Sequence, residues 1–171
     1  MKPLIRSALT ALVGVILSIG VTSSAFAQKS LKDQLIGTWM PLSVENVSKA
    51  GDRRQEFGPN PNGIFIFEPN GHFVVVLTRP GVPKYASNDR LEGTAEENTA
   101  AAQGVLAFFG TYSVNEVDHF IALHVDGSSY PNINGADRKF TITKLTEDEL
   151  DYSVLAPTAG AAVYAVLKRI K

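Results

Sequence analysis

The sequence predicts an all-β protein: an eight-stranded, up-and-down antiparallel β-barrel with one helix in an inserted connection. Short runs of β-branched and aromatic residues alternate with Gly-, Pro- and Asn-rich turns from residue 37 to residue 170. The connections between these runs are mostly short, and closing the sheet leaves a strand-rich chain without free edges. A two-layered sandwich is the alternative architecture.

The best local signal is a hairpin. Residues 63–68 and 72–78 are two apolar runs that flank a turn containing Asn70-Gly71, the dipeptide most typical of tight β-turns. Both runs are apolar at consecutive positions. We therefore expect one face to point to a core and the other to be covered or to line a cavity.

The other elements follow from the same reading of the chain. A capping box at Thr94 and Glu97 predicts the one convincing helix, running on through residues 98–108. The connection 80–109 is longer than a barrel requires, so it is expected to act as a lid or as an outer cover. The remaining elements are expected at residues 32–35 (a helical turn), 37–47, 110–114, 119–125, 138–144, 151–155 and 162–170, with a polar loop at 51–62.

Composition excludes several classes of protein. With 171 residues, 44% of them apolar, the chain fits one globular domain. Its 16 Lys and Arg balance 17 Asp and Glu, which excludes a strongly basic nucleic-acid binder. The absence of cysteine excludes disulfides, a thiolate nucleophile and a lipid-modified cysteine. The sequence carries no signal for an oligomeric state.

The N-terminus has the pattern of a secretory signal peptide, predicted over residues 1–27. Positive charges precede an apolar run at 9–21, and small residues end in Ala-Phe-Ala at 25–27, so cleavage is expected before Gln28. The apolar run is too short to span a membrane. The mature barrel domain, 28–171, is therefore expected to be exported, to the periplasm, without a membrane span.

Several segments, taken in order, resemble the bacterial lipocalin-like domain family. They are the G-x-W opening Gly37-Thr38-Trp39, residues 57–63 with the hairpin after them, Arg79-Pro80, residues 109–112, and residues 129–132 followed by Gly135 and Arg138. The resemblance implies an up-and-down barrel with an internal cavity. It also implies that Arg169 of the last strand lies over Trp39, so Gly37, Trp39 and Arg169 are interpreted as structural.

Histidine and tyrosine supply the candidates for acid–base chemistry. His124 lies mid-strand on the face of Phe120 and Ala122, where it is either a core imidazole or a polar group on the cavity wall. Tyr112 is the second candidate. His119 and His124 are an odd number of residues apart on one predicted strand and therefore face opposite sides, so no metal site is expected.

Four further residues are candidates for ligand binding. Phe65 and Phe67 of the hairpin are expected at the cavity, together with Arg79 and Arg138. An inward-pointing arginine needs an anionic partner, because an unpaired buried charge is costly. Either a helix carboxylate (Glu96 or Glu97) or the ligand would supply it; otherwise the arginine is a rim residue that reaches water.

The sequence therefore predicts a barrel that binds a small, mostly hydrophobic molecule, without a cofactor. The alternative is a cofactor-independent isomerase, cyclase or hydrolase that uses His124 or Tyr112 on a substrate in the same cavity. A third possibility is an interaction module whose interior is filled by its own side chains.

Overall fold

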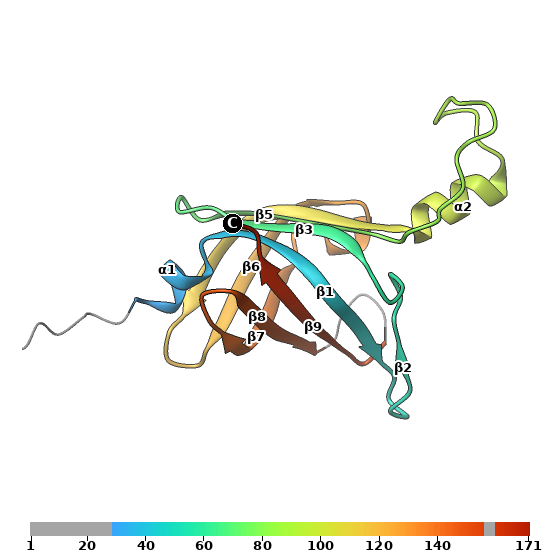
Figure 1. Ribbon diagram of the computed structural model, residues 1–171. Helices are drawn as coiled ribbons and strands as arrows, with labels where there is room; N and C mark the ends of the chain where they lie inside the picture. The colour runs from blue at the N-terminus through green and yellow to red at the C-terminus, as the bar shows by residue number, and fades with distance from the viewer. Residues whose placement is uncertain (1–28, 156–159) are drawn as a thin grey trace, which may run out of the picture.

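The computed structural model describes residues 29–155 and 160–171, which form a closed β-barrel (Figure 1). The predicted signal peptide, residues 1–27, lies outside the described residues. The elements are α1 (Leu31–Leu35), β1 (Gly37–Val47), β2 (Arg53–Arg54), β3 (Asn62–Phe67), β4 (His72–Thr78), α2 (Ala95–Gln103), β5 (Val105–Asn115), β6 (Phe120–Ser128), the short 3₁₀ helix η1 (Pro131–Ile133), β7 (Asp137–Leu145), β8 (Glu149–Leu155) and β9 (Ala162–Arg169).

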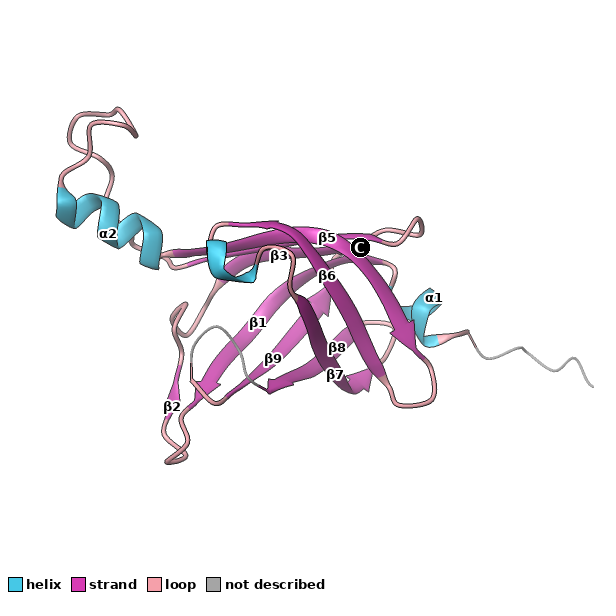
Figure 2. Ribbon diagram, turned by 180° about the vertical axis from the view of Figure 1, so that it is seen from behind, coloured by secondary structure: helices cyan, strands magenta, loops and turns pink. Residues whose placement is uncertain are grey.

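The barrel is closed by pairing between its first and last long strands. Each of β3 to β8 pairs antiparallel with the strand that follows it, and β1 pairs with both β3 and β9 (Figure 2). Trp39 is the point where these two ladders meet, since it lies opposite Phe65 on one side and Arg169 on the other. The predicted eight-stranded barrel is confirmed; the two-residue β2 is an extra strand paired to the end of β1.

The predicted hairpin is present as β3 and β4, and Phe67 lies opposite Phe73 next to the turn. Gly71 in the turn has φ +86°, a conformation that favours glycine. The inner face of β4 carries Phe73 and Val75, both buried, whereas Val74 on the outer face is 39% exposed. The outer apolar face of the hairpin is therefore not fully covered.

The inserted connection is neither a lid nor an outer cover. Thr94 and Glu97 form the predicted capping box, with the Glu97 amide donating to Thr94 Oγ1 at 3.2 Å. The helix ends at Gln103 rather than continuing through residue 108, because the apolar residues from Val105 onward pair with β4 instead. In Figure 1, α2 projects from the barrel, and none of its residues is buried.

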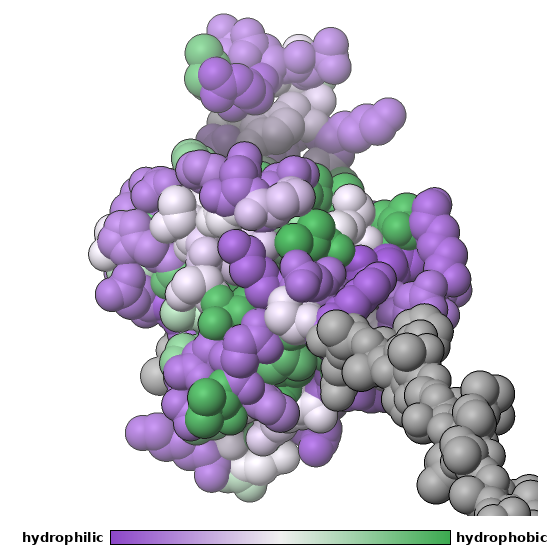
Figure 3. Space-filling view, turned by 90° about the vertical axis from the view of Figure 1, so that its left-hand side faces the viewer, coloured by the Kyte–Doolittle hydropathy of each residue, from purple (hydrophilic) through white to green (hydrophobic). Residues whose placement is uncertain are grey.

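The two ends of the barrel are built differently. At one end, which we call the closed end, α1 packs its fully buried Leu35 into the core, and the Glu116 carboxylate accepts hydrogen bonds from the Leu31 and Lys32 amides at 2.8 and 3.1 Å. The opposite, open end is where β1 and β8 finish and β5 and β7 begin. Seen from the side of α1, the surface is mainly hydrophilic with small, separated apolar patches (Figure 3).

No helix in the described parts of the chain is both long enough and apolar enough to cross a bilayer.

Candidate functional site: the open-end cavity

Trp39 and Arg169 seal the closed end. The indole is fully buried, and its N–H donates to the Leu35 carbonyl at 2.9 Å. The guanidinium carbon of Arg169 lies 4.0 Å from the centroid of the Trp39 ring. A cation in this position over an indole contributes about 0.5–2 kcal/mol. The interior of the barrel at this end is therefore occupied by the side chains of Trp39 and Leu35, with Arg169 packed against the indole.

The Arg169 guanidinium also ties this end to the chain around it. It donates to the Ile36 carbonyl at 2.7 Å and to the carbonyls of Gln34 and Glu147. Gly37 has φ +135°, and a Cβ added there would lie 2.5 Å from Arg169 Nη1. Glycine is therefore required at this position both by the backbone conformation and by the approach of the arginine.

A layer of aromatic side chains fills the middle of the barrel. Phe65 and Phe67 are almost fully buried, and the Phe67 ring meets the Tyr112 ring edge-on with centroids 5.2 Å apart. The Tyr112 hydroxyl donates to the Glu68 carbonyl at 2.8 Å, and burial raises its pKa. Phe65, Phe67 and Tyr112 are thus core residues and do not line the cavity described next, contrary to the expectation that they would contact a ligand.

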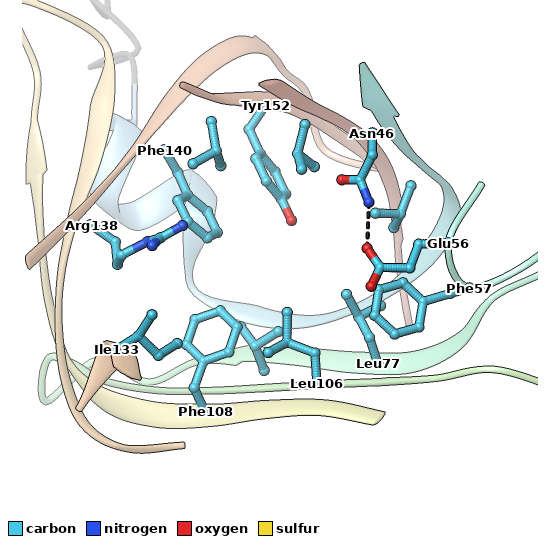
Figure 4. A pocket seen from close by; sticks show the side chains of 14 residues that line it. Asn46, Glu56, Phe57, Leu77, Leu106, Phe108, Ile133, Arg138, Phe140 and Tyr152 are labelled. Carbon is cyan, nitrogen blue, oxygen red and sulfur yellow. Dashed lines mark hydrogen bonds between the residues drawn. The ribbon is translucent and has the colours of Figure 1, made fainter. Parts of the chain in front are cut away.

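The open half of the barrel holds an internal space of about 50 Å³, the open-end cavity (Figure 4). A space of this size holds a few water molecules, since one water needs roughly 10–15 Å³ by this measure. Its lining residues come mainly from the strand ends at the open end: Val44, Asn46, Glu56, Phe57, Val75, Leu77, Leu106, Phe108, Ile133, Arg138, Phe140, Tyr152, Val154 and Val163.

Arg138 places a cation at this cavity. It lies on the inner side of β7 in step with the buried Phe140 and Ile142, and its side chain points inward (Figure 4). Burial lowers the pKa of its guanidinium, although an arginine remains charged at neutral pH. Within residues 29–155 and 160–171, no carboxylate forms an ion pair with it.

Tyr152 places a hydroxyl in the same cavity. Its ring is stacked on Phe140, with centroids 4.6 Å apart and planes 13° from parallel. The side chain is 4% exposed, its hydroxyl points into the cavity, and burial alone raises its pKa well above the usual value for tyrosine (Figure 4). The group is therefore protonated at neutral pH and able to donate a hydrogen bond.

A third polar group lies across the cavity from Arg138. The Glu56 carboxylate accepts a hydrogen bond from the Asn46 side-chain amide (Figure 4). Both residues also line an outer groove of about 730 Å³, so the cavity and the groove meet at this pair. Arg79 belongs to the groove: it is exposed, lies outside the cavity, and its Nε donates to the Glu56 carbonyl at 2.9 Å.

Two apolar side chains cover the open end. Phe57, in the loop after β2, is 4% exposed, and Ile133, in η1, is 6% exposed; both line the cavity. The connection 80–109 was expected to act as a lid or an outer cover, but the residues at the open end come from these two short segments instead. Both side chains therefore narrow the open end of the cavity, whereas α2 projects away from the barrel.

His124 lies on the outer surface of the barrel, which corrects its expected place on the cavity wall. Its side chain is 50% exposed, and Nδ1 lies 2.8 Å from Asp137 Oδ1. His124 does share a face with Phe120, but the aliphatic side chains of Ile121, Leu123 and Val125 occupy the inner face. His119 is in the turn before β6, with φ +51°, so it is not on a strand at all.

We predict that the His124–Asp137 pair stabilises the fold only at lower pH. The hydrogen bond to Asp137 raises the pKa of His124 above 6.5, so the stabilisation is complete below that ordinary value and disappears as the pH rises through the raised pKa. An NMR titration of the His124 ring should show the raised pKa, and Asp137→Asn should lower it. An unchanged His124 pKa in that variant would contradict the assignment.

Sequence reasoning missed Asn46, Glu56, Phe57, Ile133 and Tyr152. The alternation of Leu150, Tyr152 and Val154 would have identified Tyr152 as an inward residue of β8. The covering residues had no such signal, because they come from a loop and a 3₁₀ turn whose positions depend on contacts distant in sequence.

Comparison with known proteins identifies the family. A family model described as a lipocalin-like domain matches residues 36–162, and the chain therefore belongs to the lipocalin-like domain family. The match bears out the resemblance seen in the sequence, and with the closed barrel it supports a ligand-binding barrel protein. No curated protein matches the chain.

The chain is also similar to several solved structures. A lipocalin-like protein from Bacteroides uniformis has 14% sequence identity, with 80% of this chain and 99% of that chain covered and a TM-score of 0.45. A redesigned β-barrel has 13% identity, coverage of 82% and 95%, and a TM-score of 0.43. A de novo designed fluorescence-activating β-barrel has 13% identity, coverage of 84% and 100%, and a TM-score of 0.43.

Proposed function

We propose that this protein binds a small, mostly apolar molecule in the open-end cavity and that it does so after export. The observation that carries the proposal is a mostly apolar space inside the open half of the barrel, lined in part by the buried side chains of Phe57 and Ile133. Enclosed apolar sites with a few placed polar groups are typical of small-molecule binding.

The volume limits what the ligand can be. At about 50 Å³ the cavity is too small for a large hydrophobic molecule. The ligand is therefore short, or it extends past Asn46 and Glu56 into the outer groove. Binding is preferred over catalysis because the His124 imidazole is outside the barrel and the Tyr112 hydroxyl is bonded to a backbone carbonyl.

Export rests on the signal-peptide pattern of residues 1–27 alone. The mass of the protein recovered from the periplasm tests it. A chain that begins at Gln28 supports export, and a full-length chain found in the cytoplasm contradicts it.

A titration with hexanol, whose chain is long enough to extend from the cavity past Asn46 and Glu56 into the outer groove, tests binding in the cavity. NMR spectra of isotope-labelled protein should show shifts at the amides of Phe108, Phe140 and Val154. Leu106→Trp should fill the cavity and weaken binding at least about tenfold, because the ligand loses its space. Leu42→Trp makes the same change at an outer position that is 47% exposed, and it should leave binding unchanged. Equal binding by the two variants would place the ligand elsewhere.

A further inference from the structure

Side chains of β7 alternate between the inside and the outside of the barrel, and this alternation places the charged Arg138 on the inner side. Residues two apart on a strand share a face, so Arg138 must point the same way as Phe140, which is 4% exposed in the core. Lys139 between them points outward and lies 4.1 Å from the centroid of the Phe120 ring. The neighbouring cation is thus exposed, and the inner one faces the cavity.

The carboxylates that could have neutralised Arg138 are used elsewhere. Glu97 accepts hydrogen bonds from the Thr94 and Ala86 amides at 2.9 and 2.8 Å, within the connection 80–109. Asp137, the next residue along the strand, is paired with His124 on the outside. Neither can reach the cavity.

The carboxylate that does face the cavity is on the other wall. Glu56 is hydrogen-bonded to Asn46 and forms no ion pair among the described residues. It lies across the cavity from Arg138 (Figure 4). The partly buried Arg138 guanidinium is therefore left with no protein anion among the described residues, so an anionic ligand group can pair with it.

Tyr152 adds a second unused donor. Tyr152 is 4% exposed, and its hydroxyl points into the cavity (Figure 4). The hydroxyl has no hydrogen-bond partner in the described part of the chain. A guanidinium and a hydroxyl facing one apolar space can together donate to the two oxygens of a carboxylate, and a guanidinium matches that planar group in shape as well as in charge.

We propose that the open-end cavity binds the carboxylate of a small amphipathic acid, held by Arg138 and Tyr152. The apolar part of the acid lies against Leu77, Leu106 and Phe108 on the opposite strands. Glu56 sets the orientation, because it repels the head group and keeps the carboxylate on the Arg138 side. This inference rests on the proposed function and names the chemical class of its ligand.

Hexanoate, hexanol and hexylamine, which share a tail length and differ in the head group, test the proposal by calorimetric titration. Hexanoate should bind about tenfold to a hundredfold more tightly than hexanol, the range of a charge-assisted hydrogen bond. Arg138→Met should remove that difference and leave hexanol binding unchanged. Tyr152→Phe should reduce it about threefold to tenfold. Lys139→Met, with the same loss of charge on the outer face, should have no effect.

The stability of Arg138→Met separates a binding residue from a structural one. Since the guanidinium has no protein partner, the variant should melt at the same temperature as the wild type or higher. If it fails to fold, an NMR titration of the wild-type Arg138 side-chain N–H with hexanoate still decides: a shift supports the proposal and no shift refutes it.

The possible outcomes separate this inference from the proposed function. Equal binding of hexanoate and hexanol overturns the role of Arg138 but leaves the cavity as a binding site. Tighter binding of hexylamine would mean that Glu56 binds the head group, and this result would also overturn the proposed role of Arg138. If none of the three binds, both the inference and the proposed function fail.

Discussion

Replacing Trp39 by alanine is expected to lower the free energy of unfolding by about 3–5 kcal/mol. The indole is fully buried, and the alanine would leave a void where its ring met β1, β3 and β9. The Leu35 carbonyl would lose its donor, and the Arg169 guanidinium would lose the ring 4.0 Å away. Urea unfolding followed by circular dichroism measures the change.

Arg169→Met is the comparison for this prediction. It removes the cation and its hydrogen bonds but keeps the indole in place, so a smaller loss of about 1–3 kcal/mol is expected. A loss below about 1 kcal/mol for Trp39→Ala would show that the closed end does not hold the barrel together.

Replacing Phe140 by alanine is expected to cost a similar amount, about 3–5 kcal/mol, and to enlarge the open-end cavity. Phe140 is stacked on Tyr152 at 4.6 Å and meets Phe108 edge-on at 6.5 Å. Toluene should bind in the new space and restore part of the stability, because a ligand that binds only the folded state raises its stability. Thermal unfolding with and without toluene measures both effects.

Phe109→Ala is the matched control for Phe140→Ala. Phe109 is 54% exposed on the outer face of β5, so its loss should change the stability by only about 0.5 kcal/mol and create no toluene site. Equal costs for the two substitutions, or toluene stabilisation of both, would contradict the assignment of Phe140 to the cavity wall.

The parts of the fold that follow from local chemistry could be predicted. The Asn70-Gly71 turn predicts the β3–β4 hairpin, and Thr94 with Glu97 marks the start of α2. The end of α2 could not be predicted from propensity, because Val105 and the residues after it gain more by pairing with β4 than by extending a helix. The projection of α2 away from the barrel also has no local signal.

The candidate site was harder to predict than the fold. Arg138 lines the open-end cavity, which is one of the two positions that the sequence left open for it, and Arg169 lies over Trp39 as the family resemblance implied. His124 was assigned to the wrong face, because its strand is apolar on both sides and the alternation alone does not say which side is inner. Phe65 points to the inside of the barrel as predicted. Whether an inner residue packs in the core or lines the cavity depends on its position along the barrel axis, which is set by pairing between distant strands.

Native mass spectrometry of the protein purified from the cells that produce it is the most direct test of whether the open-end cavity binds a ligand. The wild-type chain should carry a small molecule of defined mass, and Leu106→Trp should carry none while Leu42→Trp still carries it. A wild-type protein that is always free of ligand, or a bound molecule that remains in Leu106→Trp, would contradict the account.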